Sequence, residues 1–318
     1  MPHLTEIDAD TIARLLPMGA AVDALEAALL AGLDPEADPP RTASPTPGAP
    51  GGQLLLMPSA TASYAGVKLA TVAPDNPGRG LPRIQGAYVL FDGATLGPLA
   101  LLDGIALTSL RTPAVSALAV RHLAVPEARR LVVFGTGPQA WGHVEAMRAV
   151  RPVEHVDIVG RDPGRVAGFA AACEAAGLSA ATATPDAVAA ADLVCCCTSA
   201  RAPLFDGALL PPHATVVAVG SHEPGAREVD DQSVGRAGAV VVEARSAALR
   251  EAGDVIQAVA AGAFDASRLA TLAELVRGQV TVPEGRPRLF KSVGMAWEDL
   301  VTAAAVHERA ALRPRPHP

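Results

Sequence analysis

The stretch Leu131–Met147, LVVFGTGPQAWGHVEAM, decides the fold that the sequence predicts. It begins with an apolar run that ends at Phe134, continues with Gly135-Thr136-Gly137 and resumes with the apolar spacing of a helix. This order of strand, glycine turn and helix is typical of the first βα unit of a dinucleotide-binding domain. The diphosphate of a nucleotide is then expected at the first N–H groups of the helix.

Each small residue of this turn has a separate physical role. Gly135 allows the tight turn, and Gly137 lets backbone amides approach the diphosphate because it carries no Cβ atom. Ala140 takes the place of the third small residue, which lets the helix pack closely on the strand. The cofactor-binding residues predicted in this unit are Gly135, Thr136, Gly137, Pro138, Gln139 and Ala140.

The chain that follows the turn alternates between short apolar strands and alanine-rich helices. We predict strands at 156–159, 193–197, 215–219 and 239–243, and this alternation favours a parallel sheet with helices on its faces. The carboxyl ends of parallel strands meet on one edge, where ligands bind. The cofactor-binding residues predicted at these ends are Gly160, Arg161, Asp162, Thr198, Ser199, Val219 and Gly220.

The first hundred residues have a different organisation. Residues 11–33 carry helix signals with Thr11 as the expected cap, and residues 34–52 are rich in proline and glycine, which predicts a loop. Between 53 and 102, short apolar strands alternate with turn signals. This pattern predicts a mostly antiparallel sheet.

Two more helices are expected outside the parallel sheet. One covers 107–124, with Thr112 as its cap and Pro113 in its first turn. The other begins at residue 296 and ends at about residue 312, and it opens with the acids Glu298-Asp299, which suit a helix N-terminus.

Composition limits the class of protein. With 318 residues, half of them hydrophobic, the chain can form one large or two ordinary domains with buried cores. A net charge of −7 argues against nucleic acid or an anionic membrane as the main partner. No run approaches the ~20 apolar residues of a membrane span, and the acidic N-terminus resembles no targeting peptide. The four cysteines predict neither disulfides nor a metal site, and a cytoplasmic location is expected.

The tip of the second predicted strand bears on the choice of cofactor. NAD-specific folds place an acid there, about 20 residues past the glycines, on the ribose 2′-hydroxyl. Here the tip reads Gly160-Arg161-Asp162, and Arg161 could pair with a 2′-phosphate. We therefore favour NADP(H), with NAD(H) as the alternative. The competing interpretation is a solvated Arg161 and an Asp162 that caps the next helix.

Three basic residues ahead of the glycine turn could hold a small anion: Arg41 in the proline-rich loop, Lys68 in YAGVKLATV and Arg111 in LTSLRTPAV. Lys68 lies among apolar neighbours, an unfavourable place for an unpaired charge. Arg111 lies at the predicted helix start, where a cation opposes the helix dipole. A structural salt bridge is the alternative for each residue, but together the three could clamp a carboxylate.

With these residues and the motifs around them, the chain resembles the ornithine cyclodeaminase/μ-crystallin family from about residue 41 to residue 306. The motifs that carry the resemblance are LMP at 56–58, GVK at 66–68, the stretch 76–82, SLRTPAVSALA at 109–119, GTGPQA at 135–140, GSHEPGAREVD at 220–230 and FKSVGMAWED at 290–299. The resemblance implies an α/β homodimer with a Rossmann domain over 124–295. It also implies an α+β domain for substrate binding and dimerisation over 1–123, completed by 296–318.

The resemblance also implies roles for individual residues. Arg41, Lys68 and Arg111 would hold the carboxylate of an amino or imino acid, with Met57 in the same substrate site. The matching motifs place four further residues among the cofactor-binding set, namely Thr112, Ser292, Val293 and Gly294.

Two positions depart from the pattern of ornithine cyclodeaminases, which carry a glutamate before LMP and an aspartate after the strand end at Gly220. Leu55 and His222 stand there in this sequence. Leu55 cannot bind an ammonium group, so we expect an apolar or cyclic substrate. His222 can titrate near neutral pH and could exchange a proton with the substrate nitrogen. The alternative is a loop histidine without a catalytic part.

The sequence thus favours an NADP(H)-dependent reductase of 2-imino acids, either cyclic ones such as pyrroline- or piperideine-2-carboxylate or linear ones. Lys68 and Arg111 would orient the carboxylate, and Lys68 could also assist proton transfer to the nitrogen. The alternatives are an alanine dehydrogenase-like enzyme, a redox-neutral cyclodeaminase, which Leu55 and His222 disfavour, and an NADPH-bound storage protein of the μ-crystallin type. The expected partner is a small imino or amino acid.

Overall fold

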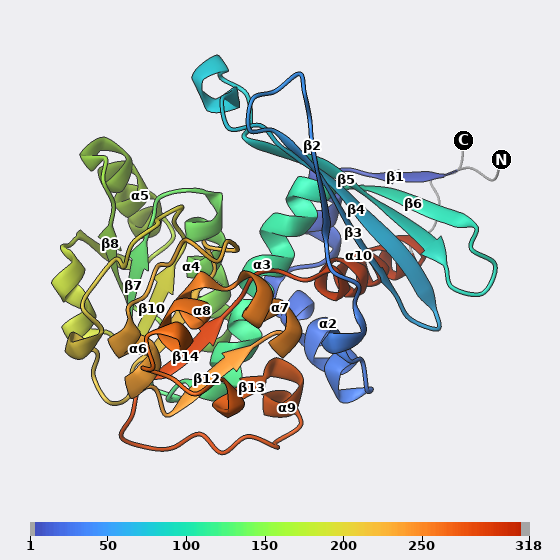
Figure 1. Cartoon of the computed structure of the whole chain (residues 1–318). Helices are drawn as coiled ribbons and strands as arrows, with labels where there is room; N and C mark the ends of the chain where they lie inside the picture. The colour runs from blue at the N-terminus through green and yellow to red at the C-terminus, as the bar shows by residue number, and fades with distance from the viewer. Residues whose placement is uncertain (1–3, 313–318) are drawn as a thin grey trace. The chain divides into compact units, whose positions relative to one another are not determined.

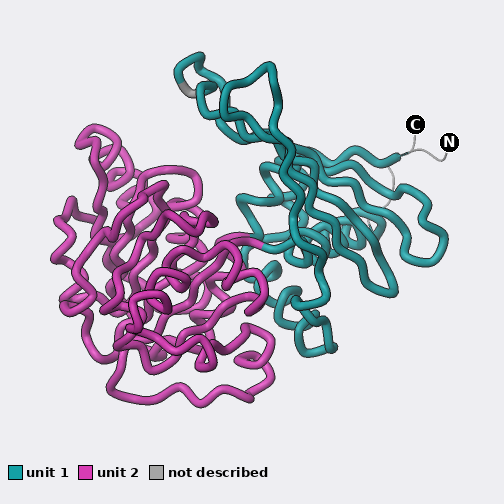
Figure 2. Tube along the Cα trace, viewed as in Figure 1, with its two compact units in different colours: residues 1–111, 295–318 teal, residues 112–294 magenta. Residues whose placement is uncertain are grey.

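The computed structural model describes residues 4–312 and divides the chain into two compact units (Figure 2). Unit 1 consists of Met1–Arg111 and Met295–Pro318, and unit 2 consists of Thr112–Gly294. The division that the sequence suggested after residue 123 coincides instead with the end of helix α3 (Gly104–Leu123). The boundary between the units therefore lies inside this helix.

Unit 1 is built on a six-stranded sheet in the order β1-β6-β5-β4-β3-β2 (Figure 1). Strands β2 to β6 pair antiparallel and β1 pairs parallel with β6, so the predicted, mostly antiparallel sheet is confirmed. The strands are β1 (Thr5–Ile7), β2 (Thr42–Pro45), β3 (Gln53–Ala60), β4 (Tyr64–Val72), β5 (Ile84–Asp92) and β6 (Pro98–Asp103).

The proline-rich segment 34–52 is not only a loop, as predicted. It contains the 3₁₀ helix η1 (Pro35–Ala37), which the Asp34 side chain caps by accepting from Glu36 N–H, and the strand β2. Strand β2 tolerates Pro45 because it forms the edge of the sheet, where a missing N–H leaves no ladder bond unmade. The high proline and glycine content of this segment gave no sign of either η1 or β2.

The predicted single helix over 11–33 is two helices, α1 (Ala9–Leu15) and α2 (Met18–Leu30). Pro17 separates them, since proline lacks the N–H that a continuous helix would use. The expected cap Thr11 is wrong, because its own N–H donates to the carboxylate of Asp8, the true cap, at 2.8 Å.

Helix α3 begins at Gly104, and the predicted cap at Thr112 is therefore wrong. The carboxylate of Asp103 accepts from the N–H groups of Ile105 and Ala106, both at 2.9 Å, and starts the helix earlier. Pro113 lies inside α3 instead of in its first turn. Arg111 consequently does not oppose the dipole at a helix start.

The last helix, α10 (Ala296–Ala311), agrees with the prediction. It packs on β3, β4 and β5 and on α2. Trp297, Leu300, Ala303 and Val306 are buried and recur at helical spacing, which explains why this segment joins unit 1.

Unit 2 is built on an eight-stranded, all-parallel sheet in the order β13-β12-β14-β11-β10-β7-β8-β9 (Figure 1). This confirms the predicted parallel sheet. Its strands are β7 (Arg130–Phe134), β8 (His155–Val159), β9 (Ser179–Thr182), β10 (Leu193–Cys196), β11 (Thr215–Ala218), β12 (Ala239–Val242), β13 (Leu269–Thr271) and β14 (Arg288–Lys291). Its other helices are α4 (Pro138–Val150), α5 (Pro163–Ala175), α6 (Asp231–Arg236), α7 (Arg245–Glu251), α8 (Gly253–Ala260) and α9 (Leu272–Val276).

The prediction missed β9, β13 and β14, of which β14 lies between β11 and β12. Its four residues, RLFK, are all buried although two are charged, so no apolar run marks the strand in the sequence. The four cysteines are free, and those of β10 are buried. Within residues 4–312, no helix combines the length and the apolar character that crossing a membrane requires.

Candidate functional site

Three side chains form a row across the sheet of unit 1. In the register of β3, β4 and β5, Met57 pairs with Lys68 and Lys68 pairs with Tyr88. All three are buried, and the side chain of Lys68 is 5% exposed. A lysine held this deep in a sheet requires a counter-charge.

That counter-charge comes from the first turn of α10. Lys68 Nζ lies 2.8 Å from Asp299 Oδ2, and Arg111 Nε lies 3.1 Å from Asp299 Oδ1. Arg111 NH1 lies 2.7 Å from Glu298 Oε2. We call Lys68, Arg111, Glu298 and Asp299 the Lys68–Arg111 cluster. Glu298 and Asp299, which the sequence placed at the helix N-terminus, thus form ion pairs with the predicted substrate-binding cations. Lys68 and Arg111 share the carboxylate of Asp299.

The cluster changes the acid–base behaviour of Lys68. Burial, followed by the positive charge of Arg111, lowers the pKa of Lys68 to about 8, while Asp299 acts in the opposite direction. An amine with a pKa near 8 can both give and take a proton close to neutral pH.

The glycine of the GVK motif has a steric explanation. A Cβ atom on Gly66 would lie 2.1 Å from the hydroxyl oxygen of Tyr88, so the ring of Tyr88 can extend over β4 only where residue 66 is glycine. Ala70 lies two residues after Lys68 on β4 and therefore on the same face of the sheet. The register pairs it with Leu55 of β3 and with Gly86 of β5. Small or apolar residues therefore adjoin Lys68 on this face.

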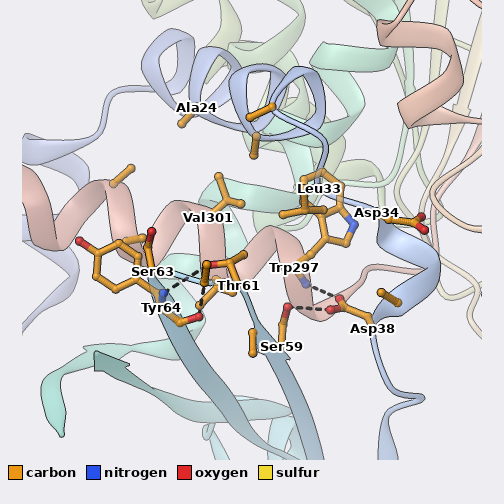
Figure 3. A pocket seen from close by; sticks show the side chains of 18 of the residues that line it. Ala24, Leu33, Asp34, Asp38, Ser59, Thr61, Ser63, Tyr64, Trp297 and Val301 are labelled. Carbon is orange, nitrogen blue, oxygen red and sulfur yellow. Dashed lines mark hydrogen bonds between the residues drawn. The ribbon is translucent and has the colours of Figure 1, made fainter. Parts of the chain in front are cut away.

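Arg41 is half-buried and directly precedes β2, whose first residue pairs with Leu56. Asp38, three residues earlier, anchors this segment by accepting from Ser59 Oγ and from the backbone N–H of Trp297, both at 2.6 Å. These two contacts lie beside an open pocket of about 760 Å³ that α2, η1, the β3–β4 turn and α10 line (Figure 3). Neither Lys68 nor Arg111 lines this pocket.

Unit 2 contains a cleft of about 900 Å³ at the carboxyl ends of β7, β8 and β10. Gly135 has a φ of +112°, and a Cβ atom there would lie 2.6 Å from the carbonyl oxygen of Cys197. A Cβ atom on Gly137 would meet nothing within 4 Å. Gly137 caps α4 without any side-chain bond, and Pro138 follows it. The first N–H groups of α4 are therefore available to an anion.

The rim of this cleft carries two arginines. Arg161 and Arg165 both line it and are exposed, and Arg165 donates to the carbonyl of Thr136 at 3.4 Å. Asp162 caps α5 by accepting from the N–H groups of Gly164 and Arg165. The sequence pattern singled out Arg161 but not Arg165, which lies one helical turn further on.

Two predicted cofactor-binding residues are tied together by a glutamate that the sequence analysis missed. Glu228 accepts from the N–H and the hydroxyl of Thr198 and from the N–H of Gly220, all at 2.7 Å. A Cβ atom on Gly220 would lie 1.8 Å from the carbonyl oxygen of Thr198, so this position requires glycine. Glu228 lies within the GSHEPGAREVD motif, but no spacing rule marks it as a link between two strand ends.

The end of β14 is held in a comparable way. Glu243, which follows β12, accepts from Ser292 Oγ at 2.6 Å, from Val293 N–H at 2.8 Å and from Gly294 N–H at 3.1 Å. The structure therefore brings the predicted residues Ser292, Val293 and Gly294 to the same sheet edge as Thr198, Ser199, Val219 and Gly220.

Two predicted residues remain, His222 and Thr112. His222 is exposed and lies four residues beyond the end of β11, after Val219 and Gly220. Thr112 is buried in α3, where its carbonyl accepts from Ser116 Oγ at 3.1 Å. Its predicted part in cofactor binding stays a prediction.

Comparison with known proteins places these features in context. The model of the Ornithine cyclodeaminase/mu-crystallin family matches residues 7–313. A Δ1-pyrroline-2-carboxylate reductase of Bacillus cereus is 37% identical over 268 residues, which cover 81% of this chain and 82% of that protein.

Two solved structures extend the likeness to the whole fold. Δ1-Pyrroline-2-carboxylate reductase from Thermococcus litoralis, in complex with NADH and L-proline, superposes with a TM-score of 0.90 at 28% identity and covers 97% of this chain and 98% of its own. An archaeal alanine dehydrogenase dimer with bound NAD superposes with a TM-score of 0.89 at 27% identity. The match covers 97% of this chain and 96% of that one.

Proposed function

The chain belongs to the ornithine cyclodeaminase/mu-crystallin family, and from this membership we propose that it is an NADP(H)-dependent reductase of 2-imino acids. Cyclic ketimines such as pyrroline- or piperideine-2-carboxylate are the proposed first choice. The observation that carries the proposal is the Lys68–Arg111 cluster, in which two buried cations from different elements share Asp299.

The cluster suits a carboxylate. Arg111 offers a planar fork of donors and Lys68 a compact ammonium group, and their common carboxylate keeps the two cationic groups close together. We propose that a substrate carboxylate binds both groups alongside Asp299, because an ammonium group carries three donors and a guanidinium group five. Arg41 and Met57 are the further proposed contacts, from the start of β2 and from β3.

Lys68 is the proposed proton donor. When bound, the reduced nicotinamide supplies a hydride to the imine carbon, and the nitrogen must receive a proton for C=N to become CH–NH. Lys68 can give that proton because its pKa is lowered to about 8. His222, exposed at the loop after β11, is a second proposed donor.

The surroundings of Lys68 favour a ring over a charged side chain. Leu55 is half-buried on the same face of the sheet, and Ala70 and Gly86 beside it are small. An apolar ring can contact these apolar residues, whereas a distal ammonium group would find no counter-charge at Leu55. This favours cyclic imino acids over diamino acids.

The residues of the unit 2 cleft fit a nicotinamide dinucleotide. The uncapped N-terminus of α4 suits the diphosphate, and the open space at Gly137 leaves room for it. Arg161 and Arg165 at the rim support a 2′-phosphate, and Asp162 is already committed to capping α5. We therefore propose NADP(H), although the two solved relatives contain NADH and NAD.

We also propose a homodimer. The sheet face opposite Lys68 carries Leu54, Leu56, Val67 and Leu69, of which Leu54 is 37% and Leu69 is 38% exposed. A partly exposed apolar face of this kind is typical of subunit contacts. Light scattering on the wild type and on Leu69→Asp tests it: a dimer that dissociates supports the proposal, and a wild-type monomer contradicts it.

NADPH oxidation against a panel of cyclic and linear 2-imino acids, with NADH in parallel, tests the proposed activity. We expect turnover with pyrroline- or piperideine-2-carboxylate and a preference for NADPH. Turnover confined to linear imino acids would favour an alanine dehydrogenase-like enzyme. Nucleotide binding without any turnover would favour a storage protein.

A further inference from the structure

We propose that two buried carboxylates, Glu228 and Glu243, bias a bound nicotinamide toward its oxidised form and so make the reduced form a stronger hydride donor. This inference rests on the proposed function, because it requires a nicotinamide dinucleotide in unit 2. Glu228 is 0% exposed and Glu243 is 1% exposed. Both therefore act through their charge and not through contact with solvent.

The strand order of the parallel sheet indicates which strand ends lie nearest to a bound nicotinamide. Along the chain, β8 and β9 follow β7 on one side of the sheet, and β10, β11 and β14 lie on the other side. A dinucleotide lies across such a reversal of strand order, with its adenosine at the end of the second strand, here β8. The nicotinamide half consequently belongs to the ends of β10, β11 and β14.

Glu228 joins two of these three ends. Its Oε1 accepts from Thr198 N–H and Oγ–H at the end of β10, and its Oε2 accepts from Gly220 N–H at the end of β11. Burial is the largest effect and leaves the pKa of Glu228 raised, although the nearby Lys291 and the three donors oppose that rise. Because both oxygens accept from N–H groups, the charged carboxylate matches this environment.

Glu243 supports the third end. It accepts from Ser292 Oγ, Val293 N–H and Gly294 N–H, which directly follow β14. Within the described residues 4–312, neither Glu228 nor Glu243 forms an ion pair, so neutral donors satisfy both carboxylates without cancelling their charge.

The buried charges around these strand ends do not balance. Among the described residues at these strand ends, Lys291 is the buried cation; its Nζ lies 2.9 Å from Asp254 Oδ2, and its charge also acts on Glu228, so one cation faces three carboxylates. Burial raises the pKa values of Cys196 and Cys197 well above their usual value, so these thiols stay neutral. Two carboxylates therefore remain in excess, those of Glu228 and Glu243.

This excess distinguishes the two oxidation states of the cofactor. The oxidised nicotinamide ring carries one positive charge that the reduced ring lacks. Fixed negative charge at the ends of β10, β11 and β14 lowers the free energy of the oxidised ring and leaves that of the neutral reduced ring nearly unchanged. Hydride release from the reduced form becomes more favourable as a result.

Equilibrium binding of NADP⁺ and of NADPH to the full-length protein, without imino acid, tests the proposal. Glu228→Gln keeps the shape of the side chain and removes its charge. We expect the ratio Kd(NADP⁺)/Kd(NADPH) to rise about tenfold or more, because losing a negative charge weakens binding of the positively charged oxidised ring and not of the neutral reduced ring. Asp157→Asn is the matched control, because Asp157 is a buried carboxylate of β8 that pairs with Arg130. The control should leave the ratio unchanged.

A purely structural role for Glu228 would weaken both nucleotides by the same factor, and an unchanged ratio would overturn the inference. If Glu228→Gln does not fold, Glu243→Gln decides in the same way, with a rise in the ratio supporting the inference and an unchanged ratio overturning it. Failure of the wild type to bind either nucleotide would overturn the proposed function itself. Binding with an unaltered ratio in the variants overturns only the inference drawn from Glu228 and Glu243.

Discussion

Both units bury charged groups at their sites, but the two units differ in the balance of positive and negative charge. In the Lys68–Arg111 cluster of unit 1, each cation contacts a carboxylate, and two cations meet two acids. At the strand ends of unit 2, one ammonium group contacts Asp254, and the carboxylates of Glu228 and Glu243 remain. A paired cluster can turn its cations toward an incoming anion, whereas an excess of carboxylates favours a cationic ring.

The largest expected effect breaks the pairing in unit 1. Asp299→Asn leaves both Lys68 and Arg111 without their shared counter-charge, so we expect kcat/KM for the imino acid to fall about a hundredfold or more. The unfolding free energy should fall by about 3 kcal/mol, the cost of leaving a buried charge unpaired. Steady-state kinetics and urea unfolding measure the two effects.

Glu298→Gln is the comparison variant, because it removes a contact of Arg111 and leaves both contacts of Asp299 in place. Its effect should be smaller. The ratio of NADP⁺ to NADPH affinity should not change in Asp299→Asn, in contrast to Glu228→Gln. Equal effects of Asp299→Asn and Glu298→Gln on kcat/KM would show that the shared carboxylate has no special role.

The sequence made the two sites predictable to different extents. Strand β7, the glycine turn and α4 follow from local rules, since each glycine and apolar residue acts on its near neighbours. Lys68 and Arg111 were recognisable as charges in unfavourable settings. Their link through Asp299 was not, because it joins residues about 190–230 positions apart in the chain, as the residue numbers show. The roles of Glu228 and Glu243 could not be predicted for the same reason, because their hydrogen-bond donors lie at the ends of other strands.

A second prediction uses the pH dependence of unit 1. Lys68 binds a carboxylate and donates a proton in its charged form, and its pKa is about 8. As pH rises through 8 the ammonium form is lost, so kcat/KM should fall by about tenfold per pH unit above that value. In Lys68→Arg, residual activity should lose this alkaline limb, since arginine stays protonated. A limb that persists unchanged at pH 8 would assign the titration to a group other than Lys68.

The smallest expected effect concerns the rim of the unit 2 cleft, which Arg161 and Arg165 line. Arg161→Asp should lower the preference for NADPH over NADH about tenfold, the typical strength of one charge-assisted hydrogen bond. Arg165→Ala should act in the same direction. Arg250→Asp, at an exposed arginine that pairs with Glu251 in the same unit, is the control. An unaltered preference in both rim variants would favour NAD(H) as the cofactor.

The assignment of imine reduction to the Lys68–Arg111 cluster is tested most directly by one measurement, the conversion of Δ1-pyrroline-2-carboxylate to proline with NADPH by the wild type and by Lys68→Ala. We predict one proline formed per NADPH oxidised in the wild type. In Lys68→Ala, turnover should fall by about 10²–10⁴-fold while the Kd for NADPH stays nearly unchanged. Normal turnover in Lys68→Ala would remove Lys68 from the reaction and contradict the assignment.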